Sequence, residues 1–241
     1  MILAHLTHEL RALKTCSLTC RSWYAVAVIH LHHTLTLGNG PYLTRGRLKP
    51  LSKLHGLGLI PLVKEIRVKQ PPGADAWFVP REFNRRDLRY FTAFANVQTL
   101  AVQSFQIYHF IPGIERYFGH FSPMVRSIVL SSLQCTPRQL LYFLSLFPNL
   151  DNIEIRHALP FTHTPDTGLI PFTTPSLRGR LVLHHFGWVE TWTDLATLCG
   201  GLRFSYVDMY GSVRCAPVLL DGCAETLETL RLNTTNDLGS K

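Results

Sequence analysis

The sequence lacks long apolar runs, closely paired cysteines and a secretory leader. Its longest apolar runs, residues 57–63 and 140–147, fall well short of the roughly 18 residues that a membrane-spanning helix needs. None of its six cysteines forms a C-x-x-C pair, and its first residues show neither a basic start nor an apolar core. We therefore expect free thiols, no membrane span, and a location in the cytoplasm or nucleus.

The short motifs of common active sites are missing as well. The sequence contains no G-x-S-x-G nucleophile elbow, no P-loop and no H-E-x-x-H, and residues 56–58 lack the third glycine of a dinucleotide fingerprint. The densest histidine cluster, residues 30–33, follows Cys16 and Cys20. It falls where a helix is expected to change into a strand, so its side chains would point in different directions and not toward one metal ion. We expect neither an enzyme nor a bound metal or cofactor.

Acidic residues are scarce relative to basic ones. The 241 residues include 16 Asp and Glu against 24 Lys and Arg, a formal net charge of +8, which is compatible with an acidic or phosphate-rich partner. The basic residues are spread along the chain and are not interleaved with aromatic residues, so nucleic-acid binding is not favoured. With 46% hydrophobic and 17% charged residues, the composition is that of a globular chain with a sizeable core.

One short apolar pattern recurs along the chain. It has the form apolar-x-x-apolar-x-apolar and occurs at residues 63–68, 97–102, 125–130, 150–155 and 227–232, with looser copies at 177–183 and 202–209. From residue 125 onward the copies start 25 to 27 residues apart, the spacing of repeat proteins. Each copy predicts a short strand whose alternate residues turn inward.

The segments between the copies carry helical apolar spacing. They are residues 86–96, 112–123, 137–149, 193–201 and 216–226. Residues 44–55, before the first copy, also show helical steps, although Pro50 opposes a helix there. In residues 137–149, Thr136 is placed to cap a helix, Pro137 to occupy its first position and Pro148 to end it. The sequence therefore predicts an α/β fold in which short parallel strands alternate with return helices. Its last strand would be an open edge, so we expect the array to continue or to be closed by another chain.

Two proline-rich inserts, residues 71–80 and 158–175, interrupt this rhythm. They are expected to loop out on one face, either as partner-binding loops or as solvated loops without a role. Before the repeats, Leu10, Leu13 and Leu18 recur at the steps of short helices broken by a turn. A helix pair this short cannot bury its own apolar stripe, so it needs either a partner surface or a following domain.

Residues 13–23, L-K-T-C-S-L-T-C-R-S-W, resemble the second half of the F-box found in fungal F-box proteins. Residues 32–37 resemble the strand that usually follows it. The later copies resemble the irregular leucine-rich repeats found behind many F-boxes. The chain would then consist of an F-box-like helical module, residues 1–31, and a leucine-rich-repeat-like solenoid, residues 32–241. The opening Leu-Pro helix of the family is missing, so either the F-box is truncated or its adaptor binding is weakened.

The resemblance implies a substrate receptor of a cullin-RING ubiquitin ligase, which binds a Skp-type adaptor, and through it the cullin, by its F-box and an unspecified substrate protein by its repeats. The adaptor-binding residues would be Leu6, Leu10, Leu13, Leu18, Cys20 and Trp23. The substrate-facing residues would be the variable positions of the repeats: Glu65, Arg67, Thr99, Ser127, Asn152, Glu154, Thr229 and Arg231. The alternative is a repeat scaffold unconnected to ubiquitin, with the helices as a cap.

Overall fold

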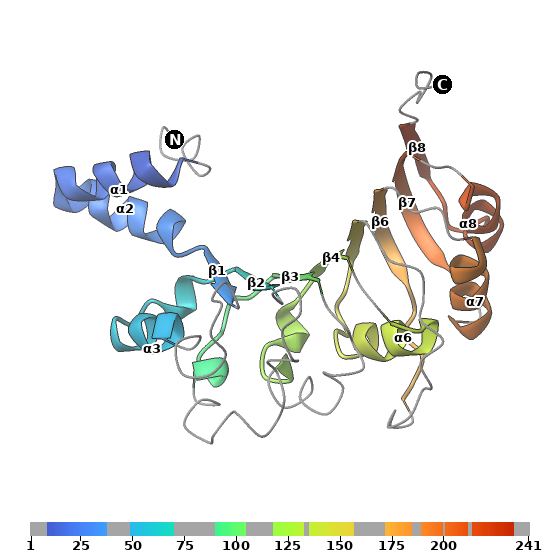
Figure 1. The fold of residues 1–241 in the computed structure, drawn as a ribbon, viewed down its shortest axis with the longest axis horizontal. Helices are drawn as coiled ribbons and strands as arrows, with labels where there is room; N and C mark the ends of the chain where they lie inside the picture. The colour runs from blue at the N-terminus through green and yellow to red at the C-terminus, as the bar shows by residue number, and fades with distance from the viewer. Residues whose placement is uncertain are drawn as a thin grey trace.

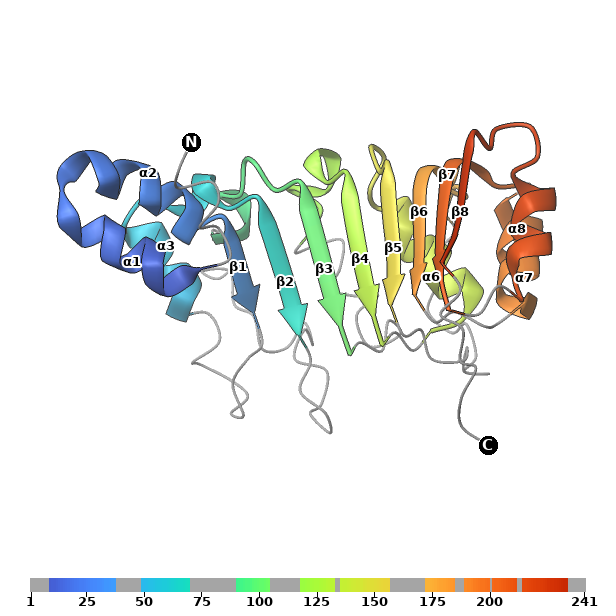
Figure 2. The same cartoon turned by 90° about the horizontal axis from the view of Figure 1, so that it is seen from above.

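The computed structural model of the chain is an α/β fold built on one parallel sheet. It describes residues 9–37, 49–69, 90–104, 118–132, 135–156, 172–184, 189–199, 201–211 and 214–233. Eight strands lie side by side in the order in which they occur in the chain, and every neighbouring pair is parallel (Figures 1 and 2). The predicted α/β class with short parallel strands is therefore confirmed.

All seven copies of the apolar pattern form strands, and residues 32–37 provide the strand before them. The strands are β1 (Thr34–Leu37), β2 (Glu65–Lys69), β3 (Thr99–Gln103), β4 (Ser127–Ser131), β5 (Asn152–Arg156), β6 (Arg178–His184), β7 (Arg203–Tyr210) and β8 (Thr229–Asn233).

The described helices between strands lie on the outer side of the curved sheet, and the inner side is left open (Figure 1). They are α3 (Lys49–Gly56), α6 (Pro137–Ser145), α7 (Val189–Cys199) and α8 (Ala216–Gly222), with short 3-10 turns at η2 (Ile60–Leu62) and η4 (Ser122–Met124). The predicted segments 86–96 and 112–123, and both proline-rich inserts, fall wholly or partly outside the described residues. Among the described helices, none is long and apolar enough to span a lipid bilayer.

The core is a set of aliphatic rows that run across the strands. In one row Ile66, Leu100 and Ile128 are aligned by the parallel register and are completely buried. The row continues through Ile153 and Leu181, and a second row two residues further along each strand is buried in the same way. Burial of these rows against the helices supplies the main stabilisation of the sheet.

Backbone hydrogen bonds at the strand entrances repeat from layer to layer. The carbonyl of Lys64 accepts from two successive amides of the next layer, those of Gln98 and Thr99, at 2.8 and 3.0 Å. The carbonyls of Gln98 and Arg126 accept two amides each in the same way. The layers from β2 to β5 are therefore joined in the same way, although the chain segments between them differ in length.

Asparagine side chains tie some layers together just before the strands. Asn96 donates its side-chain amide to the carbonyl of Pro61 at 2.8 Å, and Asn149 donates to the carbonyl of Pro123 at 2.7 Å. Both prolines lie in 3-10 turns that lead into strands. In both cases the asparagine directly precedes a copy of the apolar pattern and the proline lies two residues before the preceding copy, so the contact occupies the same place in both layers.

Two helices lie beyond β1 at the amino-terminal end of the sheet (Figures 1 and 2). They are α1 (Leu10–Thr19) and α2 (Arg21–Leu31), which pack against each other. Their buried residues Leu13 and Ala27 lie outside the continuous core formed around the described part of the sheet, whereas Leu35 and Leu37 of β1 belong to that core. The helix pair is thus packed largely separately from the sheet.

Helix α6 begins with the predicted cap, which is part of a complete capping box. The Thr136 hydroxyl accepts from the Gln139 amide at 3.1 Å, and the Gln139 side chain accepts from the Thr136 amide at 3.0 Å. Both residues are buried. If the Thr136 hydroxyl were removed, the backbone amide of Gln139 would therefore lose its acceptor without ready access to water.

We predict that Thr136→Ala lowers the free energy of unfolding by about 1 to 2 kcal/mol, because a buried helix amide loses its acceptor. Urea denaturation followed by circular dichroism measures the change. The control is Thr197→Ala on α7, since this exposed hydroxyl donates to the carbonyl of Thr193 within the same helix. An equal loss in the two variants would contradict the importance of the cap.

Gly179 adopts φ +81° at the irregularity where β6 pairs with β7. A Cβ atom at this position would lie 2.2 Å from the Asp151 carbonyl oxygen, which already accepts from the Arg180 amide. We predict that Gly179→Ala destabilises the chain by about 2 kcal/mol or more, from steric overlap together with left-handed backbone strain. Gly56→Ala is the control, because no atom lies within 4 Å of its added Cβ. Thermal unfolding of both variants tests this, and an unchanged midpoint for Gly179→Ala would refute it.

Candidate functional site

The inner face of the sheet, here called the open face, carries the side chains that alternate with the buried rows. Its first row consists of Thr34, Glu65, Thr99, Ser127, Asn152, Arg180, Tyr206 and Thr229. Its second row consists of Thr36, Arg67, Ala101, Val129, Glu154, Val182, Asp208 and Arg231. All eight positions expected to face a substrate lie in these two rows, so the structure brings them together on one surface.

The β2 end of the open face is organised by an ion pair. Arg67 donates to both carboxylate oxygens of Glu65, at 2.7 and 3.2 Å, and the Thr34 hydroxyl donates to the same carboxylate at 2.9 Å. Burial opposes ionisation of Glu65, but the hydrogen bonds from Arg67 and Thr34 outweigh it and lower the pKa of this carboxyl below its ordinary value of 4.5. Glu65 therefore remains charged but is already engaged within the chain.

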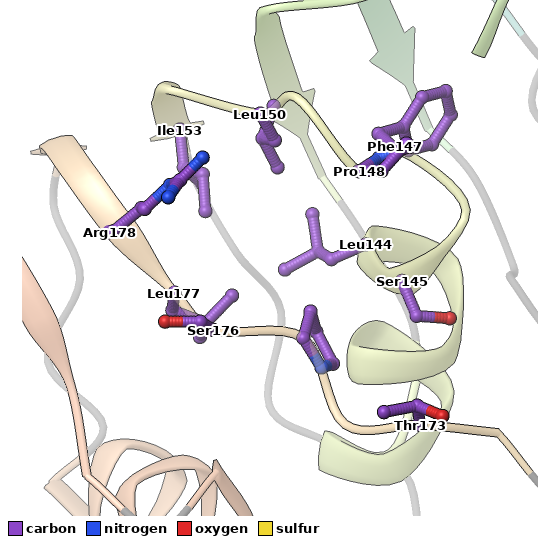
Figure 3. A pocket seen from close by; sticks show the side chains of 11 residues that line it. Leu144, Ser145, Phe147, Pro148, Leu150, Ile153, Thr173, Ser176, Leu177 and Arg178 are labelled. Carbon is purple, nitrogen blue, oxygen red and sulfur yellow. The ribbon is translucent and has the colours of Figure 1, made fainter. Parts of the chain in front are cut away.

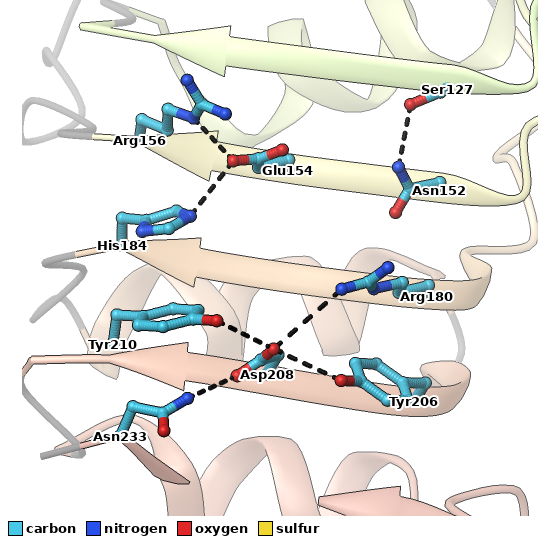
Figure 4. Close-up of polar contacts among 10 residues, drawn as sticks. All are labelled: Ser127, Asn152, Glu154, Arg156, Arg180, His184, Tyr206, Asp208, Tyr210 and Asn233. Carbon is cyan, nitrogen blue, oxygen red and sulfur yellow. Dashed lines mark hydrogen bonds and ion pairs between the residues drawn. The ribbon is translucent and has the colours of Figure 1, made fainter. Parts of the chain in front are cut away.

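A second carboxylate, Glu154, lies at the middle of the face. Its Oε1 atom accepts from Arg156 Nε at 2.6 Å and lies 3.1 Å from His184 Nε2 (Figure 4). The His184 ring stacks on the Tyr210 ring with centroids 4.6 Å apart and planes 7° from parallel. Glu154 thus connects β5 to β6, and the stacked rings connect β6 to β7.

The third carboxylate, Asp208, is the most buried polar group of the face. Its side chain is only 2% exposed. It accepts from the hydroxyls of Tyr206 and Tyr210 at 3.3 and 3.2 Å and from the Asn233 amide at 2.9 Å, with Arg180 at 4.0 Å (Figure 4). The negative charge of Asp208, followed by burial, raises the pKa of Tyr210, so this phenol stays protonated as a donor. Asp208 is thereby held rigidly between β6 and β8.

The open face offers guanidinium donors and aromatic rings to a partner, while its three carboxylates are engaged within the chain. Such groups bind protein segments by hydrogen bonds and stacking. Within the described ranges, no group of three or more His, Cys, Asp or Glu side chains is placed to hold a metal ion. Chemically, the exposed guanidinium groups and rings of the face can contact anionic or aromatic groups.

A cavity of about 330 Å³ lies on the other side of the sheet, between α6 and the segment that leads into β6 (Figure 3). Leu144, Leu150 and Ile153 line it together with Ser145 and Arg178. Thr173 and Pro175, from the end of the second proline-rich insert, also line this cavity. None of the residues expected from the sequence to bind an adaptor or a substrate does, so the cavity is separate from the open face.

The helix pair α1–α2 carries a second exposed surface, here called the helix-pair surface. The name covers the exposed apolar side chains of Leu18, Trp23, Tyr24, Val26 and Ile29, which the two helices turn to solvent in more than one direction. Leu18 is 86% exposed and Trp23 is 40% exposed, and the occurrence of five such side chains on two short helices, more than any one of them, marks a candidate interaction site.

The expected adaptor-binding residues are only partly brought together on this surface. Leu18, Cys20 and Trp23 are exposed there. Leu13 is fully buried, so its expected contact with an adaptor is corrected: it supports the helix pair from inside. Leu10 begins α1 but its side chain, like all of Leu6, lies outside the described residues.

Several residues of the open face were not expected from the sequence. Arg180, Tyr206 and Asp208 come from the two looser copies of the pattern, whose alignment the sequence leaves open. A third row lies one residue beyond each copy and consists of Lys69, Gln103, Ser131, Arg156, His184, Tyr210 and Asn233. Extending the inward–outward alternation by one position would have found this row.

We predict that Glu65→Gln flattens the pH dependence of stability on the acidic side. Because the pKa of Glu65 is lowered on folding, its interactions stabilise the folded chain above pH 4.5, and this stabilisation is lost as the pH falls through the lowered pKa. Melting temperatures measured between neutral pH and about pH 3 test this. Thr34→Val removes one hydrogen bond and keeps Arg67, so it should give an intermediate slope. Identical acid sensitivity of Glu65→Gln and the wild-type chain would rule the interpretation out.

A comparison of the chain with models of known protein families gives no match. A comparison with curated proteins gives no significant match either. Neither comparison assigns the chain to a family.

Proposed function

We propose that this chain is a substrate-recognition subunit of an SCF-type ubiquitin ligase, with an F-box-like helix pair and irregular leucine-rich repeats. The observation that carries the proposal is the helix-pair surface. Leu18, Trp23 and Ile29 are exposed on helices that lie at one end of the sheet and outside its core. They belong to the segment whose sequence resembles an F-box, or directly follow it.

Apolar side chains of this size favour a protein partner. Exposing Trp23 and Leu18 together forgoes about 2 kcal/mol or more per side chain that burial would provide. Large aromatic and aliphatic anchors of this kind often dominate the energy of a protein interface. The helix-pair surface is thus suited to an adaptor with an apolar groove, and the Skp-type adaptor is the partner that the sequence resemblance implies.

The open face is the proposed substrate surface. It presents Arg67, Arg156 and Arg180 on one side of the sheet. The helices pack on the opposite side (Figure 1). The proposed contribution to ubiquitin transfer is proximity: the chain would hold a substrate lysine near the charged conjugating enzyme without taking part in bond chemistry. This role places the chain in the cytoplasm or nucleus.

A repeat scaffold unconnected to ubiquitin is the second candidate. It is favoured by the position of α1 and α2 beyond β1, where a cap on the end of a sheet would lie (Figure 2). A cap needs only to cover the edge of the sheet and has no use for large apolar groups that face solvent. The two candidates therefore differ in what happens to the helix-pair surface when the adaptor is present.

We predict that the chain co-purifies with a Skp-type adaptor and that Leu18→Asp combined with Trp23→Ala weakens this binding at least 30-fold, about 2 kcal/mol. Isothermal titration calorimetry with the purified adaptor measures the affinity. Leu57→Asp is the control, because Leu57 is 60% exposed but follows α3 and is not one of the residues of the helix-pair surface. If the wild-type chain ignores the adaptor at micromolar concentration, the scaffold is favoured instead.

A further inference from the structure

The charges of the open face at β6–β8 are unevenly available to a partner. Asp208 accepts three hydrogen bonds and is almost fully buried, and Glu154 is shared by Arg156 and His184. Arg180, by contrast, is 52% exposed and lies 4.0 Å from Asp208, at the limit of an ion pair. The negative charges here are satisfied within the chain, while the positive ones keep unused donors.

Arg231 makes this imbalance larger. It aligns with Asp208 across the β7–β8 pair and is exposed. Within the part of the chain that the structure describes, Arg231 forms no ion pair with a carboxylate. As far as the described residues go, no carboxylate of the chain competes with an anionic group from outside for its guanidinium donors.

The ring of Tyr206 holds both arginines. The Cζ atoms of Arg180 and Arg231 lie 4.7 and 5.6 Å from the Tyr206 ring centroid, and the two side chains come from the strands on either side of β7. Tyr206 is itself fixed by its hydrogen bond to Asp208. Cation–π contacts of this kind orient a guanidinium group before a ligand arrives and leave its N–H edge free.

The two guanidinium groups, each within about 6 Å of the same ring centroid, are close enough together for one extended acidic peptide to reach both. Side chains that point to the same side of an extended chain repeat every second residue, about 7 Å apart. We propose that Arg180 and Arg231, positioned by Tyr206, bind two carboxylates in a Glu-x-Glu arrangement on an extended segment of the protein that the open face holds. This inference rests on the proposed protein-binding role of the open face and names the chemistry of its partner.

The test is fluorescence anisotropy with a fluorescein-labelled Gly-Gly-Glu-Ala-Glu-Gly probe and the full chain. The wild-type chain should bind this probe in preference to the same peptide with Gln in place of both Glu residues. Arg180→Gln with Arg231→Gln should weaken binding at least about tenfold, since two charge-assisted contacts are lost. The charge-matched control is Lys53→Gln with Arg138→Gln, on the helices of the outer side, and it should bind like wild type.

Two further variants keep the result interpretable. Arg180→Lys with Arg231→Lys retains the charge but loses the planar fork, and Tyr206→Leu retains both arginines but loses the ring that orders them. Each should weaken binding by less than the double Gln variant does, with an unchanged circular dichroism spectrum. The proposal is overturned if the wild-type chain prefers neither peptide, if the control variant loses as much affinity, or if the loss occurs only in unfolded variants.

A single-stranded oligonucleotide of the same charge is the competing probe. If it binds through Arg180 and Arg231 more tightly than the peptide does, the surface recognises nucleic acid and the proposal fails. The adaptor titration is independent of this experiment, because it depends on the helix-pair surface. Peptide binding without adaptor binding would overturn the ubiquitin function alone, and adaptor binding without peptide binding would overturn this inference alone.

Discussion

The structure depends on one repeated interaction, the burial of aliphatic side chains that the parallel register aligns across the sheet. Ile66, Leu100 and Ile128 lie in one such row and exclude water completely. Because a strand turns successive side chains to opposite faces, each buried aliphatic residue fixes the residues beside it on the open face. A slip of one residue would exchange the two sets, so the buried rows hold the polar rows in place.

This constraint divides the molecule into surfaces with different chemistry. The outer side of the sheet is used by the helices and the core, and the inner side presents carboxylates that are paired within the chain and arginines that are only partly paired. The helix pair α1–α2 takes little part in the core and keeps Leu18 and Trp23 exposed. A rigid polar face and a separate apolar surface suit a chain that brings two proteins together.

Much of the fold could be predicted from the sequence, because the aliphatic pattern that identifies the strands is also the set of side chains whose burial stabilises them. The strands β2–β5 and β8 follow from strict copies of the pattern, and Thr136 with Pro137 marks the start of α6. The open face at β6 and β7 could not be predicted in detail. An irregularity at Gly179 shifts the register there, so that Tyr206, not Ser205, aligns with Arg180. The looser copies do not reveal such a shift, because it is a property of the pairing between β6 and β7 and not of either segment alone.

Leu13 shows a second limit of prediction from the sequence. Helical spacing places Leu13 and Leu18 in one apolar pattern, but it does not say which of them faces a neighbouring helix. In the structure Leu13 is fully buried and Leu18 is almost fully exposed. Five residues apart on α1, the two side chains point about 140° away from each other. Which of them is buried depends on where α2 packs against α1, and the sequence pattern of one helix does not contain that contact.

The most direct test of the separation of surfaces is hydrogen exchange of the full chain, measured by mass spectrometry with and without the Skp-type adaptor. The account predicts slower exchange in α1 and α2 when the adaptor is present and unchanged exchange in β2–β8. Protection that appears on the strands, or no protection in the helix pair at saturating adaptor, would contradict it.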